Sequence, residues 1–475
     1  MKIGAKSLVL VFLLLITITL VNADIINEYS DTSCNEVICT RNIYSYQRYY
    51  QSNGQWQEIN ENFNNQNCLA GYDSCVLNNL YQVYIKNNIN TANSIKFVKD
   101  GFSIEFQPIS SGYSASLLSS PQNSNANLNN NIALFPNSFN NIDIKYYYLP
   151  RMFKEEIIIN SNQIIPPLQL NPLQEDLKIK FKINTNNLNI QTSQGNWNQI
   201  ETIITQDSIA FTSNNNPLFY LIKPIAYDSG YKYTDLQYEL SNTNNELFLT
   251  IKVPYNFLIN ESTVYPVTID PTITLTDTKT NWNGYIYVNT LAVPNSYLRV
   301  SNPASKILVG QYTDLDVTNL LYRAVLEWDI SKIPDNIDII DINLSLLFTE
   351  INSLNDPISV FTMVGNSTTY PNQTGDCQGN CNFWIDAGNG TLLNSTPVTR
   401  VNSYTWFNLT SNTTEPGGIG NDLEQRLRSG LNWWSVGLKG ADLNSQKEDV
   451  FSSKDDANRT RRPLLTITYL NVANE

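Results

Sequence analysis

The sequence predicts an all-β protein, built as two tandem antiparallel β-sandwiches after a short disulfide-tied N-terminal segment. Apolar residues alternate with polar residues over many short segments, and turn residues separate these segments. Such alternation is typical of antiparallel strands that place one face on a core and the other in water. At 475 residues the chain is too long for a single core, which favours two or three domains.

The first 23 residues have the features of a secretory signal peptide. Lys2 and Lys6 precede an apolar run over residues 8–20, and Val21-Asn22-Ala23 fits the small-residue rule for cleavage before Asp24. An uncleaved anchor is the alternative, but the apolar run is short and good cleavage residues follow it. No later segment is apolar enough to span a bilayer. We therefore expect an extracellular or cell-surface protein with no membrane insertion after cleavage.

Six cysteines fall into three close pairs: Cys34 with Cys39, Cys68 with Cys75, and Cys377 with Cys381. In an exported protein this pattern predicts disulfides. We favour pairing between sequence neighbours, although four N-terminal cysteines allow three connectivities. A zinc site is the alternative, and the absence of histidine and the unequal spacings argue against it.

The formal charge is −13, and removal of Lys2 and Lys6 with the signal peptide makes it −15. This balance repels nucleic acid and anionic membranes, so neither is an expected partner. Only 15% of the residues are charged, whereas Asn, Ser, Thr and Tyr are abundant. The composition favours an extracellular β protein, and a biased genome is the alternative explanation for the many asparagines.

Residues 24–93 form a Tyr- and Cys-rich N-terminal segment. Ser52-Asn-Gly-Gln-Trp56 marks a turn within it, and two short hairpins tied by disulfides would satisfy the segment. The first sandwich is expected over residues 94–272, where Lys99-Asp-Gly101 predicts a hairpin turn between two strands.

Later strands of the first sandwich have clear periodicity. Apolar residues alternate with three lysines along residues 177–183, which predicts a half-buried strand with a lysine face in water, and residues 247–253 repeat the apolar alternation. The motif Tyr265-Pro-Val-Thr-Ile-Asp-Pro-Thr272 closes the unit as its last strand. Pro271 cannot donate to the ladder, so the strand ends there and a short joint follows.

The second unit spans residues 273–470 and leaves a short tail over residues 471–475. Opening, central and closing strand signals all follow Pro271, so we expect this unit to fold on its own. Its motifs are Leu308-Val-Gly310, Arg323-Ala-Val-Leu-Glu-Trp-Asp-Ile-Ser-Lys-Ile-Pro334, Ile339-Ile-Asp-Ile-Asn-Leu-Ser-Leu-Leu-Phe348, Trp406-Phe-Asn-Leu-Thr410, Phe451-Ser-Ser453 and Arg462-Pro-Leu-Leu-Thr-Ile-Thr-Tyr469.

Together these motifs resemble the DNRLRE-type jelly roll, a family of secreted and cell-surface proteins. The resemblance implies a jelly-roll fold, and some relatives are carbohydrate-binding modules that bind alginate. Two departures are Glu327-Trp328, where the family often has Arg-Phe, and an insertion with Cys377 and Cys381. The first sandwich is similar to β-sandwich domains that precede such jelly rolls in Rhs-like and archaeal surface proteins. That second resemblance implies no activity.

The sequence contains no histidine, which excludes Ser-His-Asp and Cys-His catalysis. Glycoside cleavage needs two carboxylates at a fixed separation across a sugar. Glu155-Glu156 and Asp455-Asp456 are adjacent in sequence, so on a strand they point to opposite faces, and we expect them in solvated turns. A lyase that uses tyrosine with arginine or lysine remains open.

Exposed aromatic side chains are the candidate sugar-binding groups, because their flat faces match the C–H surface of a pyranose ring. Burial is the alternative, and we assign Trp328 and Trp406 to the core. Only one member of the pair Trp433 and Trp434 can face inward on a strand. The candidates are Trp282, Tyr285, Tyr287, Trp384 and Trp433.

Two further kinds of site are expected. Structural calcium is common in jelly-roll carbohydrate modules, and its candidate oxygen ligands are Asp277, Asp314, Asp316 and Asp455. The N-glycosylation pattern occurs at Asn260, Asn343, Asn366, Asn372, Asn389, Asn394, Asn408, Asn412 and Asn458. Random occurrence in an Asn-rich chain is the alternative, but all of these except Asn260 fall in the second unit.

These observations favour a secreted or cell-surface, non-catalytic protein whose C-terminal jelly roll binds polysaccharide or another surface component. One alternative is a structural envelope or adhesin protein in which both sandwiches are spacers. Another is a polysaccharide lyase or glycosidase. No cofactor is expected beyond a structural calcium.

Overall fold

The computed structural model describes most of the chain after residue 23. The described ranges are 24–34, 38–113, 118–168, 170–171, 173–230, 232–275, 283–289, 296–301, 306–314, 318–335, 337–350, 356–365, 382–397, 405–412, 419–440, 447–453, 456 and 458–470. The predicted all-β class is confirmed, with antiparallel sheets and three short α-helices in these ranges. No helix in the described ranges is both long and apolar enough to cross a membrane.

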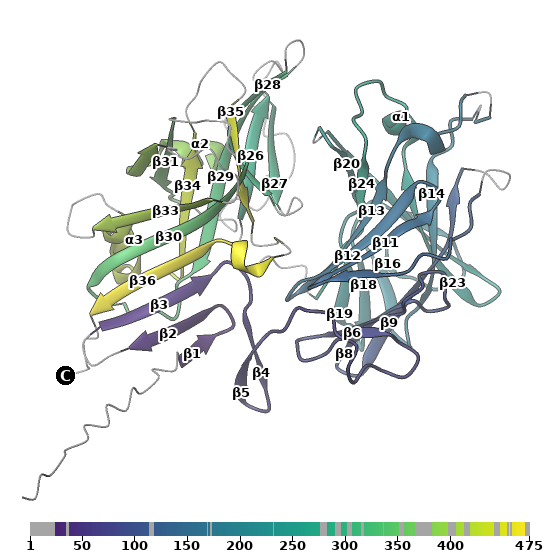
Figure 1. Ribbon diagram of the computed structural model, residues 1–475, viewed down its shortest axis with the longest axis horizontal. Helices are drawn as coiled ribbons and strands as arrows, with labels where there is room; N and C mark the ends of the chain where they lie inside the picture. The colour runs from purple at the N-terminus through teal and green to yellow at the C-terminus, as the bar shows by residue number, and fades with distance from the viewer. Residues whose placement is uncertain are drawn as a thin grey trace, which may run out of the picture.

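The first lobe is a sandwich of two antiparallel sheets (Figure 1). One sheet has the order β17 (Ile203–Thr205), β22 (Gln237–Thr243), β23 (Glu246–Val253), β14 (Leu177–Asn184), β9 (Phe102–Gly112), β8 (Ile95–Lys99), β7 (Gln82–Ile85), β6 (Ser74–Val76).

The facing sheet has the order β10 (Asn127–Asn129), β11 (Ile132–Phe139), β12 (Ile142–Tyr148), β13 (Met152–Ile159), β25 (Ile273–Thr274), β19 (Asn216–Leu221), β18 (Ile209–Ser213), β15 (Asn189–Thr192), β16 (Gly195–Asn196). β24 (Val267–Asp270) also pairs with β13, β20 (Ile225–Asp228) pairs with β24, and β21 (Tyr233–Asp235) pairs with β20. The helix α1 (Tyr255–Leu258) and the 3-10 turn η2 (Asn162–Ile164) lie in connections.

The alternation predicted for β14 is confirmed. Its apolar residues are buried while the lysines between them keep partial exposure. The predicted hairpin between β8 and β9 also forms, with Asp100 at φ 51° and Gly101 at φ 81°. Two consecutive residues with positive φ match the twist of the flanking strands, which explains the Asp-Gly pair. The core between the sheets combines aliphatic and aromatic side chains, and the ring centroids of Phe97 and Phe153 lie 4.7 Å apart in an edge-to-face arrangement.

The second lobe is built from one continuous antiparallel sheet that folds around its own core. We refer to this lobe as the second sandwich. Its order is β1 (Asp24–Asn27), β2 (Ser30–Cys34), β3 (Ile38–Tyr44), β36 (Leu464–Leu470), β30 (Ile339–Glu350), β35 (Lys447–Ser452), β28 (Lys306–Asp314), β29 (Thr318–Asp329), β34 (Trp433–Lys439), β31 (Pro357–Thr362), β32 (Leu392–Pro397). β26 (Asn283–Asn289) pairs with β29 and β27 (Ser296–Ser301), and β33 (Thr405–Asn412) pairs with β30. The remaining elements are α2 (Asn382–Asn389), α3 (Ile419–Arg428) and η3 (Arg459–Arg461).

The N-terminal segment over residues 24–93 contributes strands to both lobes. β3 pairs with the C-terminal strand β36, with Ile38 opposite Leu470 and Tyr44 opposite Leu464. Figure 1 shows the purple strands β1–β3 beside the yellow β36. β4 (Tyr49–Ser52) and β5 (Gln55–Glu58) form a separate hairpin, whereas β6 and β7 join the first sandwich. The first sandwich is therefore an insertion between strands of the second.

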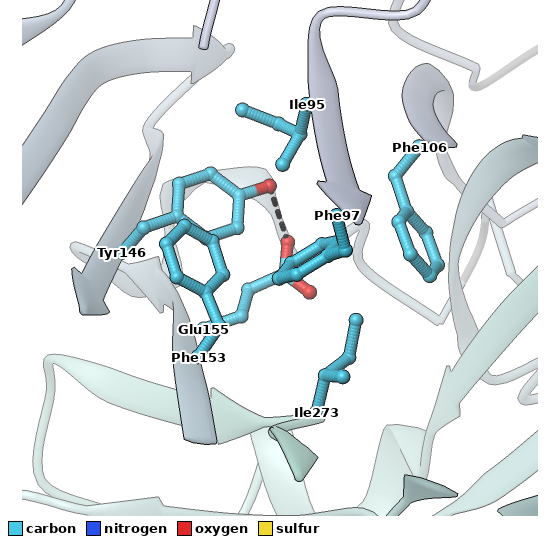
Figure 2. Close-up of a pocket in the computed structure, with 7 residues that line it drawn as sticks. All are labelled: Ile95, Phe97, Phe106, Tyr146, Phe153, Glu155 and Ile273. Atoms are coloured by element: carbon cyan, nitrogen blue, oxygen red, sulfur yellow. Dashed lines mark hydrogen bonds between the residues drawn. The ribbon is translucent and has the colours of Figure 1, made fainter. Parts of the chain in front are cut away.

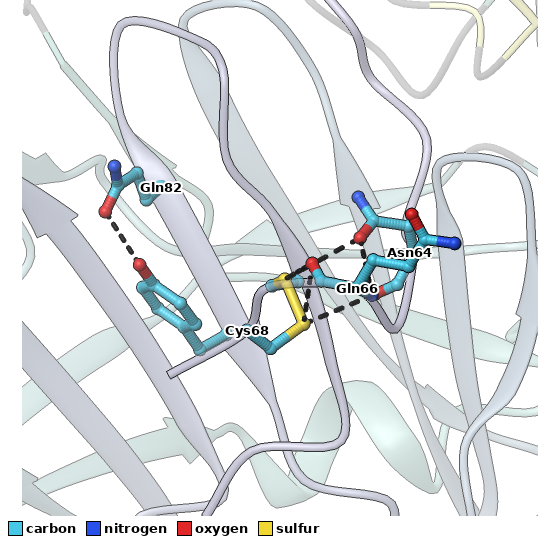
Figure 3. Close-up of a disulfide and its surroundings, with 6 residues drawn as sticks. Asn64, Gln66, Cys68 and Gln82 are labelled. Atoms are coloured by element: carbon cyan, nitrogen blue, oxygen red, sulfur yellow. Dashed lines mark hydrogen bonds between the residues drawn. A yellow bond between two sulfur atoms is a disulfide. The ribbon is translucent and has the colours of Figure 1, made fainter. Parts of the chain in front are cut away.

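Both N-terminal disulfides join sequence neighbours, as predicted. Cys34 and Cys39 lie directly opposite each other in the β2–β3 hairpin. Cys68 is bonded to Cys75 in β6, and Figure 3 shows this bridge beside Asn64. The backbones of Asn64 and Cys75 exchange two hydrogen bonds of 3.0 and 2.7 Å, so the bridge fastens a loop to the sheet edge. The predicted third bridge, Cys377 to Cys381, lies outside the described residues.

A buried ion pair fastens the chain where it leaves the second lobe. Arg462 donates to both carboxylate oxygens of Glu61 at 2.9 and 2.6 Å, and its guanidinium lies 4.4 Å from the ring centroid of Tyr46. Arg459 donates to Glu58 at 2.6 Å and to the carbonyl of Ile59 at 3.0 Å. Bidentate pairing fixes geometry as well as supplying energy, so residues 58–61 are held against the C-terminal part of the chain.

Candidate functional site

The pair Trp433 and Trp434 behaves as the strand period predicts. Trp434 is fully buried, and its ring centroid lies 5.5 Å from that of Trp328, which is also in the core. Trp433 points to the other side of β34 and stays partly exposed. Of the predicted sugar-binding aromatics, it is the one whose side chain the structure describes as accessible.

The helix α3 supplies the charged groups beside Trp433. The guanidinium of Arg426 lies 5.0 Å from the Trp433 ring centroid, in the range of a cation–π contact. Asp422 holds Arg426 at 3.3 Å and also accepts the indole N–H of Trp434 at 2.8 Å. Arg426 donates in addition to the carbonyl of Met363. These contacts fix the arginine, and through it the orientation of the exposed indole.

The local sequence explains why α3 forms there. Asp422 lies in its first turn and Arg426 and Arg428 in its last turn, so each charge complements the helix dipole. Leu423 and Leu427 are buried on the face turned to the sheet. The result is a partly exposed indole beside an arginine that Asp422 fixes. Such a surface can stack on a sugar ring and hydrogen-bond its hydroxyl or carboxylate groups.

Trp384 does not provide an open platform, in contrast to the sequence-based expectation. It lies in α2 with 7% of its area exposed, because α2 packs against β34, β31 and β29. Arg323 covers its ring at 4.2 Å and donates to its carbonyl at 2.7 Å. An added Cβ at Gly388 would come within 2.6 Å of the same guanidinium, so a larger residue there would displace Arg323 from its present position.

The other candidate ligand residues receive no structural test. Tyr285 and Tyr287 lie on β26 and Asp314 ends β28, but the orientations of these side chains are not described. Trp282, Asp277, Asp316 and Asp455 lie outside the described residues. In the part of the chain that the structure describes, no group of three His, Cys, Asp or Glu could hold a metal. Calcium binding at these aspartates stays a prediction.

Two of the predicted glycosylation sites share a defined geometry. Asn260 and Asn458 are exposed, and each side-chain oxygen accepts the hydroxyl of the sequon residue two positions later, at 2.8 Å from Ser262 and 2.7 Å from Thr460. Asn389 is exposed at the end of α2. Asn343 is half-buried on β30, between β33 and β36. The side chains of Asn366, Asn372, Asn394, Asn408 and Asn412 are outside the description.

The pair Glu155 and Glu156 does not lie in a solvated turn, which corrects the sequence-based expectation. Both are in β13, and they point to opposite faces as adjacent strand residues must. Glu155 enters the sandwich core, and Figure 2 shows its carboxyl group among Phe97, Phe153 and Tyr146. Tyr146 donates a hydrogen bond of 2.7 Å to it. Burial, reinforced by the like charge of Asp270, raises the pKa of Glu155 from 4.5 to about 7.

The opposite face of β13 carries a second group of buried charges. The ammonium of Lys154 lies 3.2 Å from Glu156 and 3.2 Å from Asp270 of β24. Burial opposes the charge of Lys154, but the two carboxylates outweigh this effect and raise its pKa. The sequence offered only a weak signal for both groups, because the charged residues 154–156 lie between the apolar residues of the run Met152–Ile159.

Comparisons with known proteins add little. No family model matches the chain, and no curated protein matches it. One similar solved structure is a GH31 alpha-xylosidase from Xanthomonas citri, at 8% identity and TM-score 0.16, over 86% of this chain and 38% of the xylosidase. Another is an exo-beta-1,3-galactanase from Phanerochaete chrysosporium, at 7% identity and TM-score 0.15, over 87% of this chain and 100% of that chain. At these TM-scores neither likeness carries an argument about function.

Proposed function

We propose that the protein is an exported, non-catalytic surface protein whose second sandwich binds polysaccharide at Trp433. The observation that carries the proposal is the partly exposed indole that Arg426 holds in place beside Asp422. A prepositioned aromatic face reduces the entropy lost on binding, and nearby charged groups give orientation to a ligand. One platform of this kind supports weak, reversible binding.

Residue chemistry supports the non-catalytic part of the proposal. The sequence has no histidine, and the adjacent carboxylates Glu155 and Glu156 face opposite sides of β13. Glycosidases need two carboxylates on either side of one scissile bond. These two carboxylates cannot meet that requirement.

A structural spacer is the second candidate, and one observation favours it. The N-terminal strand β3 pairs with the last strand β36 of the second sandwich, and the buried Arg462–Glu61 pair clamps the start of the inserted segment to that junction. The spacer reading needs no ligand.

Affinity electrophoresis of the mature protein in gels with neutral or acidic polysaccharides tests the proposal. We expect retardation in at least one gel and a loss of affinity of roughly two- to tenfold in Trp433→Ala, because about 1.4 kcal/mol corresponds to a factor of ten. Trp56→Ala is the matched control, since Trp56 is also partly exposed but lies on the β4–β5 hairpin. No retardation of the unmutated protein in any gel would favour the spacer, and release of reducing ends or unsaturated sugars would reveal an enzyme.

A further inference from the structure

Three buried charged side chains meet where the first sandwich ends. Lys154, Glu156 and Asp270 are 6%, 8% and 5% exposed, respectively. The Lys154 ammonium lies 3.2 Å from one oxygen of each carboxylate. Asp270 belongs to the motif over residues 265–272 that closes the first sandwich. It lies in β24, which pairs antiparallel with β13, the strand that carries Lys154 and Glu156.

Three hydrogen bonds orient the two carboxylates. Tyr147 donates to one oxygen of Glu156 at 2.7 Å, and Tyr227 donates to the other at 3.4 Å. The hydroxyl of Thr272 donates to the Asp270 oxygen that does not face Lys154. The amine therefore lies against one oxygen of Asp270, the Oδ2 that is bonded to the carboxyl carbon the amine would attack.

We propose that this group forms an intramolecular amide bond between the Lys154 side chain and the Asp270 side chain, with Glu156 as the proton relay. The residues supply what such a condensation needs: an amine, a carboxyl group, and a second carboxylate within hydrogen-bonding distance of the amine. All three are shielded from water, which would otherwise favour hydrolysis.

The atoms and charges of this reaction balance without any other reagent. Glu156 takes a proton from the Lys154 ammonium, and the free amine attacks the carbonyl carbon of Asp270. The new C–N bond forms as one C–O bond of Asp270 breaks. That oxygen leaves as water, with one proton returned by Glu156 and one lost from the attacking nitrogen. An ammonium and a carboxylate become a neutral amide and one water, and Glu156 ends in its starting state.

Burial supplies the driving force. Two carboxylates share one ammonium at this site, and desolvation of buried ions is costly even when they are paired. The amide removes one buried cation and one buried anion together. Ion pairs on the surface of the same sandwich gain nothing comparable, because water already solvates them. Lys182 with Glu246 and Lys223 with Asp235 are such pairs, with side-chain exposures between 34% and 49%.

The ion pairs of Lys154 with the two carboxylates also limit the rate of amide formation. An ammonium is not a nucleophile, and the two carboxylates keep Lys154 charged, so the reactive free amine is a minor species. We therefore expect slow condensation after folding. The bond would join β13 to β24 and close the chain from residue 154 to residue 270, which contains most of the inserted sandwich.

Peptide mass spectrometry of the full mature protein, on purification and after a week at 37 °C, tests the proposal. We expect a branched tryptic peptide that contains both Lys154 and Asp270 and lacks the mass of one water molecule. Trypsin should also fail to cleave after Lys154, because an acylated lysine is not a trypsin site. Lys154→Arg keeps the charge and should fold, as circular dichroism can verify, but it should show no water loss.

Glu156→Gln tests whether Glu156 transfers the proton or only lies close to the amine. If it transfers the proton, the variant should slow the condensation by at least tenfold in the same time course. Lys182→Arg is the matched control and should leave the branched peptide unchanged. Quantitative recovery of linear peptides cleaved after Lys154, at both times, would overturn the proposal. Water loss that persists in Lys154→Arg would place the modification elsewhere and would overturn it as well.

Discussion

The two sandwiches differ in how the chain builds them. All strands of the first sandwich lie between residues 74 and 274, whereas the second needs strands from both ends of the described chain. β3 and β36 pair residues near position 40 with residues near position 468. Long-range pairing costs loop-closure entropy before it returns any contact energy. The first sandwich is therefore an insertion with all of its strands in one stretch of the chain, and the second is completed by its N-terminal strands.

The largest expected effect comes from separating the two units. A fragment of residues 59–275 should fold alone and unfold cooperatively. A fragment of residues 273–470 should not reach the native state, contrary to the expectation from the strand signals, because β36 loses its partner β3. Circular dichroism and thermal unfolding of both fragments provide the measurement. Restoring residues 24–58 through a flexible linker should rescue the second fragment, and a failure to rescue would count against the insertion topology.

The clamp at the junction gives the next largest effect. Glu61→Ala leaves Arg462 buried without its carboxylate, and we expect a loss of about 3–5 kcal/mol in unfolding free energy. Glu246→Ala removes an exposed pair with Lys182 and should cost no more than about 1 kcal/mol. Urea unfolding of both variants checks this contrast. Equal losses in the two variants would show that the buried pair does not secure the junction.

The buried carboxyl group of the first sandwich should make its stability depend on pH. Because the pKa of Glu155 rises from 4.5 to about 7 on folding, the folded state binds the proton more tightly. This stabilisation is complete below pH 4.5 and is lost as the pH rises through 7. Glu155→Gln should therefore gain roughly 1–3 kcal/mol over the unmutated protein at pH 8, since one pKa unit is about 1.36 kcal/mol.

The difference should shrink to near zero at pH 4. Urea unfolding of both proteins across this range provides the measurement. A difference that does not change with pH would mean that Glu155 titrates as an ordinary glutamate.

The smallest effect on stability concerns glycans. Asn260 and Asn458 are exposed and held by their own sequon hydroxyls, so we expect both to be occupied in protein from a glycosylating host. Asn343 is half-buried in the middle of a sheet and should be unoccupied. Glycopeptide mass spectrometry gives the occupancy of each site. An occupied Asn343 with a bare Asn260 would show that exposure in the folded protein does not govern transfer.

Periodicity in the sequence predicted which segments form strands, but it did not predict which strands pair with each other. The alternation in β14 and the opposite facing of Trp433 and Trp434 follow from local geometry alone, so both predictions are confirmed. The pairing of β3 with β36 leaves no such local trace, because any alternating strand can pair with any other. Burial of Glu155 was missed for another reason. A glutamate is expected in water, and only Phe153 and Ile157, two positions away on the same face of the strand, indicated the interior.

The register between β3 and β36 tests the central claim most directly. Asn42 and Thr466 are directly opposite each other, and their side chains already share a hydrogen bond of 3.1 Å. The double variant Asn42→Cys/Thr466→Cys should form a disulfide in nearly all molecules under mild oxidation, because opposite strand residues lie within bridging distance. The offset pair Asn42→Cys/Thr468→Cys should react far less. Free thiols in the first variant, or equal bridging in both, would contradict the closure of the second sandwich by the N-terminal strand.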